Sequence, residues 1–147
     1  MSVKNRKPSL IFTDSIATDA KMTDGLRYAL VEAATVRFMA RFPDVVGIVR
    51  EDYANPRTKR QGQAIWGAWA AVDLGLARVG RTVDGEISAT TVKKIVAGHG
   101  KAEKDEVADG VRRIIGLPAD YIFANNDESD ATAVILAWLI EKGRIDS

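Results

Sequence analysis

The stretch that decides the fold is GHGKAEKDEVADGVRRIIGLP, residues 98–118, followed after a short gap by NNDESDATAVILAWLI, residues 125–140. In the first stretch a glycine-flanked basic loop precedes apolar residues that share one helical face, namely Val107, Val111, Ile114 and Ile115. This spacing predicts a helix that Gly116 closes. The second stretch predicts a helix from about Ser129 to Lys142, with acidic residues at its amino end.

Three segments upstream have the composition of strands. SLIFTDSIAT, residues 9–18, is rich in β-favouring residues, and DVVGIVRE, residues 44–51, is almost continuously apolar. A continuous apolar run of this length is typical of a strand covered on both faces in the middle of a sheet. In RTVDGEIS, residues 81–88, the pair Asp84-Gly85 predicts a turn between two short extended pieces.

Helical patterns lie between these strands. Thr23 is suited to cap a helix over 23–41, and apolar residues recur every seven residues over 63–77. A shorter helix is expected over 90–97. Strands interleaved with helices in this order indicate an α/β fold, in which a small sheet is flanked by helices. We expect residues 1–147 to form a single domain.

The amino-acid composition excludes several kinds of functional site. The chain is 46% hydrophobic over 147 residues, which suffices for one domain with a core, and its net charge of +1 neither demands nor excludes nucleic acid as a partner. With no cysteine and one histidine, His99, disulfides, zinc–thiolate centres and histidine-rich metal sites are excluded. Any metal ion would therefore be held by carboxylates.

The chain also lacks the sequence signals of membrane insertion and secretion. No apolar run reaches the length that spans a bilayer. The first residues, MSVKNRKPSLIF, lack the apolar stretch and cleavage site of a signal peptide. We therefore expect a cytoplasmic protein without a membrane partner.

Three carboxylates are candidates for a magnesium site. Glu51 follows a predicted strand at its carboxyl end, where α/β proteins bind ligands. Asp127 and Asp130 are three residues apart where loop becomes helix, so both can project from one face of the first turn. Mg²⁺ needs only a few such ligands. The alternative is that DESD is an ordinary helix cap and that Glu51 is a polar residue where a strand meets solvent.

Basic residues form two groups that suit phosphate positioning. The first contains Lys93, Lys94, Lys101 and Lys104. The second contains Arg57, Lys59 and Arg60, and Tyr53 beside it could stack on an unpaired base or simply pack. The alternative for the lysines is a solvated surface with helix pairs such as Lys101 with Asp105.

Residues 92–118, VKKIVAGHGKAEKDEVADGVRRIIGLP, and residues 127–138, DESDATAVILAW, closely resemble the C-terminal half of RuvC-type Holliday-junction resolvases, members of the RNase H-like nuclease superfamily. In that family a V-K…G-x-G-x-A-x-K-x-x-V pattern precedes a helix, and D-x-x-D-A opens the last one. The matching residues here are Lys93, Lys104, Asp127 and Asp130. The resemblance implies an RNase H-like mixed sheet flanked by helices, two aspartates that bind catalytic Mg²⁺ or Mn²⁺, and two lysines near the DNA phosphates.

The resemblance extends upstream. GQAIWGAWAAV, residues 62–72, is similar to the family's G-Q-x-x-G helix, which implies a homodimer through residues 61–77. The family places a glutamate in the strand corresponding to VVGIVRE, where a gapless match gives Val49. Glu51, two residues later, lies on the same strand face and is our choice for this ligand.

One part of the family pattern is not found. Family members open with a strand that ends in a metal-binding aspartate, and this chain is expected to begin after that strand, as an N-terminally shortened form. Residues 9–18 match the family's third strand better than its first. Strand order also argues against Asp14 as a replacement ligand. Loss of one carboxylate would weaken metal binding.

We therefore expect a magnesium-dependent, structure-selective endonuclease that resolves Holliday junctions or other branched DNA by phosphodiester hydrolysis. The expected catalytic residues are Glu51, Asp127, Asp130 and Lys104, and the three acids are the expected metal ligands. The expected DNA-binding residues are Lys93, Lys101, Lys104, Tyr53, Arg57, Lys59 and Arg60. One alternative is a RuvC-like protein that binds branched DNA without cutting it. Another is a longer natural chain that supplies the missing strand.

Overall fold

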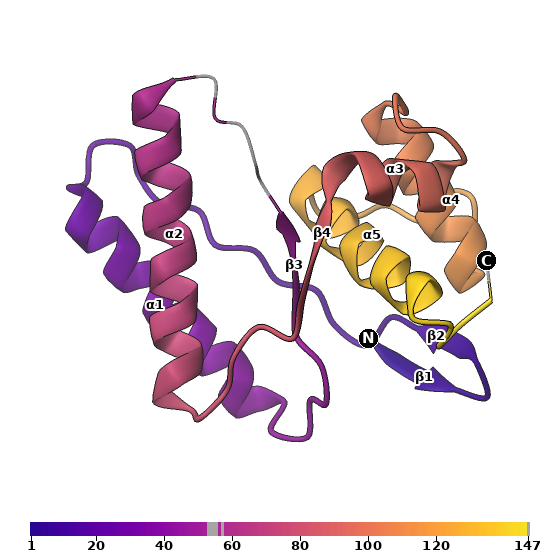
Figure 1. Ribbon diagram of the computed structural model, residues 1–147, viewed down its shortest axis with the longest axis horizontal. Helices are drawn as coiled ribbons and strands as arrows, with labels where there is room; N and C mark the ends of the chain where they lie inside the picture. Colours follow the sequence, from indigo (N-terminus) through magenta and orange to yellow (C-terminus); the bar gives the residue numbers. More distant parts are fainter. Residues whose placement is uncertain (53–55, 57, 147) are drawn as a thin grey trace. The chain divides into compact units, whose positions relative to one another are not determined.

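The computed structural model describes residues 1–52, 56 and 58–146 (Figure 1). They fall into two compact units. The first comprises the described residues of Met1–Ser15, Val49–Tyr53 and Gly85–Ser147, and the second comprises those of Ile16–Ile48 and Ala54–Asp84. The single domain expected over 1–147 stays a prediction.

The first unit is built around one helix, α5 (Asn126–Glu141). This helix packs against α3 (Ala89–Ala97), α4 (Lys104–Ile115) and β3 (Val49–Asp52). Three of its side chains, Ala133, Leu136 and Ala137, have no exposed surface. Burial of apolar surface at about 25 cal/mol per Å² is the main stabilising term in such a core.

The sheet of this unit is smaller than the sequence predicts. β3 pairs in parallel with β4 (Gly85–Ser88), with Glu51 opposite Ile87, and the two form a two-stranded sheet in the described part of the chain. The predicted strand over 44–51 in the middle of a sheet was therefore wrong in both its extent and its place. Arg50 and Glu86, which face each other in this register, form an ion pair.

The prediction of a turn at Asp84-Gly85 was also wrong, because Gly85 is the first residue of β4. The Asp84 carboxylate instead accepts a hydrogen bond from the Ile48 amide at 2.7 Å, and the Asp84 amide donates to the Ile48 carbonyl oxygen. These bonds bring the two segments together before the parallel pairing begins. A side chain at position 85 would lie 2.5 Å from the Trp138 indole nitrogen, so glycine lets Trp138 cover the strand.

The chain opens with a hairpin rather than with the strand predicted over 9–18, which was wrong. β1 (Ser2–Lys4) and β2 (Lys7–Ser9) pair antiparallel across Asn5 and Arg6, both with positive φ. A two-residue turn of this type matches the twist of the flanking strands and favours local pairing. Residues 10–19 form no strand.

Helices α3 and α4 are fixed by their caps. The Ser88 hydroxyl accepts a hydrogen bond from the Thr91 amide at the start of α3, and Gly98 ends that helix with φ 90°. A capping box between Glu103 and Glu106 starts α4, which ends at Gly116 with φ 77°. The predicted helix over 90–97 is confirmed with one added residue, and the predicted helix end at Gly116 is confirmed.

The second unit consists mainly of α1 (Asp24–Arg41) and α2 (Lys59–Arg78), which pack against each other. Thr23 caps α1, as predicted. α2 begins four residues earlier than predicted because Thr58 accepts a hydrogen bond from the Gln61 amide and acts as its cap. No helix of the described residues is long and apolar enough to cross a membrane.

Close packing of α3 on α4 gives the first prediction. A side-chain carbon added at Gly110 would lie 2.3 Å from the Val96 carbonyl oxygen, a backbone atom that cannot turn away. Gly110→Ala should therefore lower the free energy of unfolding by about 1–3 kcal/mol, as overpacked cores do. Chemical denaturation measures the loss.

Gly25→Ala is the matched control, because nothing lies within 4 Å of the added carbon in α1. That change should leave the stability equal to or slightly above that of wild type, because alanine loses less conformational freedom than glycine on folding. Equal stability of the two variants would contradict the close approach of α3 and α4.

Candidate active site

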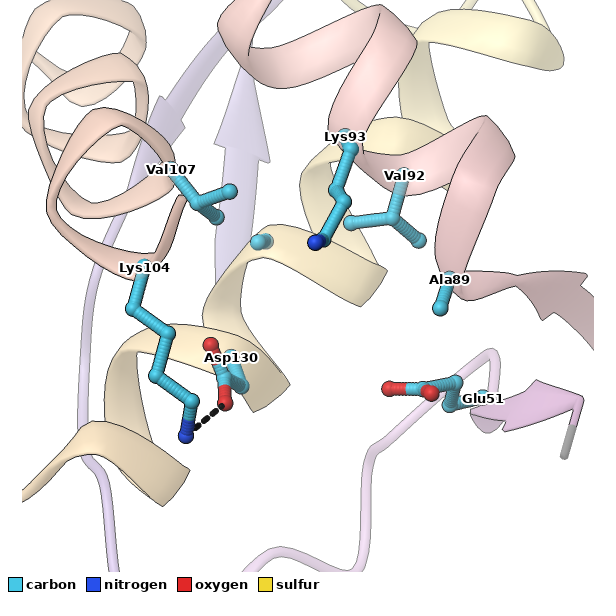
Figure 2. Close-up of a pocket in the computed structure, with 8 residues that line it drawn as sticks. Glu51, Ala89, Val92, Lys93, Lys104, Val107 and Asp130 are labelled. Atoms are coloured by element: carbon cyan, nitrogen blue, oxygen red, sulfur yellow. Dashed lines mark ion pairs between the residues drawn. The ribbon is translucent and has the colours of Figure 1, made fainter. Parts of the chain in front are cut away.

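A pocket of about 160 Å³ lies among the elements of the first unit (Figure 2). Glu51 comes from β3, Lys93 from α3, Lys104 from α4 and Asp130 from α5. The remaining lining residues are apolar: Ala89, Val92, Val107 and Ala133. Four residues predicted from the sequence as site residues therefore meet in one place, although 79 positions separate the first from the last in the sequence.

The fold explains why these four side chains converge. Val92, Val107 and Ala133 are buried in the core and form the apolar floor of the pocket. Lys93 follows Val92 on α3, and Lys104 lies three residues before Val107, about one turn back on α4. Helices that bury one face place the neighbouring residues at the edge of the core.

Lys104 and Asp130 form an ion pair at one side of the pocket. The Lys104 Nζ atom lies 3.4 Å from Asp130 Oδ2, and the side chains keep 60% and 36% of their exposure. Figure 2 shows these two side chains turned toward each other, with the Glu51 carboxylate directed into the same pocket. A pair this exposed contributes little to stability, typically about 0–1 kcal/mol.

Burial and neighbouring charges both shift the pKa of Glu51. Loss of hydration on burial raises the pKa of the Glu51 carboxyl, and the Asp130 carboxylate raises it further. Lys93 and Lys104 act in the opposite direction but do not cancel the rise in pKa. Two carboxylates thus interact repulsively beside two ammonium groups, an arrangement typical of functional sites.

Asp127 is placed differently from Asp130. It lies in the first turn of α5, is exposed, and does not line the pocket. The helix begins at Asn126, three residues earlier than predicted, so Asp130 is already in the second turn. Asp14 does not line the pocket either.

The residue that caps α5 is Asn125, which was not predicted, whereas Glu128 belongs to the DESD segment that was the predicted alternative cap. The Asn125 side chain accepts a hydrogen bond from the Glu128 amide at 3.0 Å, and the Glu128 carboxylate accepts one from the Ala124 amide at 3.2 Å. The signal was present, because asparagine followed three residues later by glutamate is a capping pattern. Neither Asp127 nor Asp130 takes part in these cap bonds.

The carboxylates suit a hard cation, but they do not form a ready-made cluster. Among the described residues, no three or more acidic, histidine or cysteine side chains gather closely enough to hold a metal ion. The predicted ligands Glu51, Asp127 and Asp130 are therefore not assembled as a triad. The pair Glu51 and Asp130 still fits Mg²⁺, which typically takes one or two carboxylates and completes its coordination with water and phosphate.

The remaining basic residues lie outside the pocket. Lys101 is exposed in the loop before α4, so it cannot form the helical pair with Asp105 that was the alternative. Lys59 is the first residue of α2 and is exposed. Tyr53 and Arg57 lie outside the described residues.

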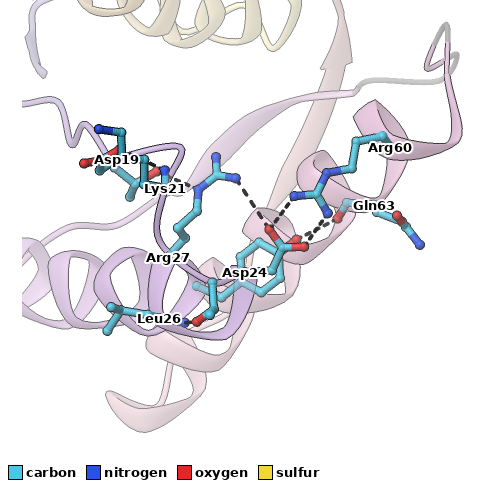
Figure 3. Close-up of polar contacts among 10 residues, drawn as sticks. Asp19, Lys21, Asp24, Leu26, Arg27, Arg60 and Gln63 are labelled. Carbon is cyan, nitrogen blue, oxygen red and sulfur yellow. Dashed lines mark hydrogen bonds and ion pairs between the residues drawn. The ribbon is translucent and has the colours of Figure 1, made fainter.

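Arg60 is engaged within the second unit (Figure 3). Its guanidinium donates to both carboxylate oxygens of Asp24 at 2.6 and 3.0 Å, which ties the start of α2 to the start of α1. Arg27 approaches the same carboxylate at 3.5 Å. Hydrogen bonding to Arg60 lowers the pKa of Asp24. Lys59 and Arg60 therefore begin a helix rather than lying in the predicted loop.

Comparison with known proteins identifies relatives across most of the chain. Residues 58–138 match the family described as crossover junction endodeoxyribonuclease RuvC. A protein of that name from Acidiphilium cryptum is 36% identical over 121 residues, which cover 82% of this chain and 70% of the relative. Another, from Rickettsia massiliae, is 26% identical over 129 residues, covering 86% and 78%.

Solved structures agree on the fold. The Thermus thermophilus RuvC structure superposes with a TM-score of 0.80 over 97% of this chain and 87% of that one, at 24% identity. The same score is found for Thermus thermophilus RuvC in complex with a Holliday junction substrate. The predicted α/β fold and the resemblance to RuvC-type nucleases are thereby confirmed. The chain belongs to the RuvC family of crossover junction endodeoxyribonucleases.

Proposed function

We propose that the chain resolves Holliday junctions or other branched DNA by metal-dependent phosphodiester hydrolysis. The observation that carries this proposal is the pocket in which Glu51 and Asp130 lie together with Lys93 and Lys104. Carboxylates can hold a metal ion that assists hydrolysis of a phosphodiester, and ammonium groups beside them can position the phosphate. The relative from Thermus thermophilus, solved with a Holliday junction substrate, supports this choice of DNA.

Each residue has a proposed role. Glu51 and Asp130 hold the cation, Mg²⁺ first and Mn²⁺ second. Asp127, which is exposed in the first turn of α5 and does not line the pocket, is the third proposed ligand and would join them only when the ion is bound. When bound, such an ion supplies an acidified water and stabilises charge on the leaving oxygen. Lys93 and Lys104 place the scissile phosphate by charge.

DNA outside the pocket is bound by the other cations. Lys101 and Lys59 are exposed and suited to phosphate contacts. Arg60 can also bind a DNA phosphate if that phosphate replaces Asp24 as its partner. Breaking this exposed ion pair costs little free energy. Arg57 and Tyr53 complete the proposed set, with Tyr53 stacking on an unpaired base.

The first test is cleavage of a labelled four-way DNA junction in Mg²⁺, in Mn²⁺ and in chelator. Wild type should cut only with metal. Asp130→Asn and Glu51→Gln should each reduce the cleavage rate on the order of 100-fold or more while junction binding persists, because each removes a proposed ligand and misplaces the reacting groups. Asp127→Asn tests the third carboxylate in the same assay.

Asp109→Asn is the matched control, since Asp109 is exposed on α4 and pairs with Arg112 away from the pocket. It should cut at the wild-type rate. Tight junction binding by wild type with no cutting in either metal would instead establish the alternative, a RuvC-like protein that binds branched DNA without cleaving it.

The raised pKa of Glu51 predicts a pH-dependent gain in stability on mutation. Because the pKa is raised, ionising Glu51 costs more free energy in the folded state than in the unfolded state, and this difference destabilises the fold at neutral pH. The difference disappears below the ordinary pKa of 4.5, where the carboxyl is protonated in both states. Glu51→Gln should therefore melt at a higher temperature than wild type at pH 7. The gain should shrink as the pH falls through the raised pKa and vanish below pH 4.5.

Thermal melts followed by circular dichroism at several pH values, without metal, measure this difference. Asp120→Asn, in the exposed loop before α5, serves as the control and should change the melting temperature little. A Glu51→Gln variant that is less stable than wild type at pH 7 would show that the ionised carboxylate is stabilised in the fold and contradict the prediction.

We also propose that the protein pairs with itself through residues 61–77. On α2 the side chains of Trp66 and Leu74 are 55% and 56% exposed, two helical turns apart. Large apolar side chains spaced this way form a stripe suited to another apolar surface. A twofold interface contains the same patch from both subunits, so two copies of each side chain would be buried.

Leu74→Glu should raise the dimer dissociation constant by at least about 100-fold, because twofold symmetry places two carboxylates where two leucines were buried. Sedimentation equilibrium measures this constant. Leu74→Met, which conserves volume and apolarity, should leave the dimer intact. A wild-type protein that sediments as a monomer at all concentrations would rule out the interface.

A further inference from the structure

Lys104 has an uncommon position for a lysine. It is the first residue of α4, where the helix dipole disfavours a positive charge, and the rest of the first turn is acidic, with Asp105 and Glu106. Its ammonium group does not extend freely into solvent but lies 3.4 Å from the Asp130 carboxylate on another helix. The carboxylate therefore offsets the unfavourable charge at the helix start.

The same carboxylate faces a second acid. Asp130 acts electrostatically on Glu51 across the pocket, and Lys104 partly counters that repulsion. Among the residues that line the pocket, Lys104 and Asp130 form a direct ion pair, whereas Lys93 affects Glu51 only through its charge. Lys104 thus neutralises Asp130 in the same way that a bound cation would.

We propose that Lys104 is an internal counter-ion that competes with the divalent cation for Asp130. The inference rests on the proposed function, in which Glu51 and Asp130 hold the metal. In the metal-free protein the ammonium group screens the two carboxylates from each other. Metal binding displaces it from Asp130, and the released lysine becomes available to a DNA phosphate.

The geometry permits this exchange at low cost. The Lys104 side chain is 60% exposed, and lysine carries its charge on a flexible four-carbon stem that can turn toward solvent. Asp130 is 36% exposed, so a hydrated ion can reach it. Loss of so exposed a pair costs little stability. The two positions of the lysine are therefore close in free energy.

Competition at Asp130 couples metal binding to DNA binding. A phosphate that draws Lys104 away from Asp130 raises the affinity for metal, and by linkage a bound metal raises the affinity for DNA by the same factor. The metal site is then weak in the free protein and strengthens when DNA is present.

The test measures Mn²⁺ affinity of the DNA-free protein by electron paramagnetic resonance of the unbound ion. Lys104→Gln should bind Mn²⁺ about two- to fivefold more tightly than wild type, the range set by exposed ion pairs. The same variant should bind the four-way junction more weakly. A merely structural defect would weaken both, so the opposite directions identify competition.

Lys142→Gln is the matched control, because it removes the same charge at the exposed carboxyl end of α5, outside the pocket. Its Mn²⁺ affinity should stay within about twofold of wild type, since screened surface charges act weakly at a distance. Lys104→Met removes the charge with a different side chain and should reproduce the gain of Lys104→Gln. In an Asp130→Asn background, Lys104→Gln should give no gain.

The outcomes separate this inference from the proposed function. If wild type binds Mn²⁺ and neither Lys104 variant binds it more tightly than Lys142→Gln, the competition is ruled out while the metal site stands. If wild type binds no Mn²⁺ and cuts no junction, the proposed function fails and the inference fails with it.

Discussion

The burial of α5 is the constraint on which the first unit depends. A helix whose Ala133, Leu136 and Ala137 are fully enclosed must be covered by other elements along its length, and α3, α4 and β3 provide that cover. Asp130, one turn before Ala133 and Val134, is held at the edge of this buried part. The core thereby fixes where the polar side chains of several elements meet.

Close approach between α3 and α4 sets the finer geometry of the pocket. Gly110 lets the backbone of α4 approach the Val96 carbonyl oxygen, and Arg113 donates a hydrogen bond to that same oxygen. With the two helices held at this distance, Lys93 and Lys104 reach one pocket from separate elements. A wider spacing would keep the core apolar but would separate the two ammonium groups.

Local signals made the helices predictable from sequence, whereas pairing between distant segments was not. Caps such as Thr23 and the glycines that end α3 and α4 act within a few residues. The strand predicted over 9–18 was wrong. The first residues of the chain instead pair with each other in a hairpin that turns at Asn5 and Arg6 and ends at residue 9. The parallel pairing of β3 with β4 follows directly after the hydrogen bonds between Asp84 and Ile48, a contact between distant segments that composition cannot reveal. Lys93, Lys104 and Asp130 were candidates from the family resemblance, and Glu51 was a candidate from its place at the end of a predicted strand. That the four meet in one pocket could be known only from the fold.

Charge in the pocket shows why a stable core and a reactive site can occupy one small unit. The apolar floor of Val92, Val107 and Ala133 stabilises the fold, and the charged groups stand at its rim. Burial raises the pKa of the Glu51 carboxyl, so ionising this group costs more free energy in the folded protein than in water. Proteins retain such local costs where function needs the group. The carboxylates of Glu51 and Asp130 repel each other, and the ammonium group of Lys104 beside Asp130 reduces that repulsion. Any other positive charge bound at Asp130 would reduce it in the same way.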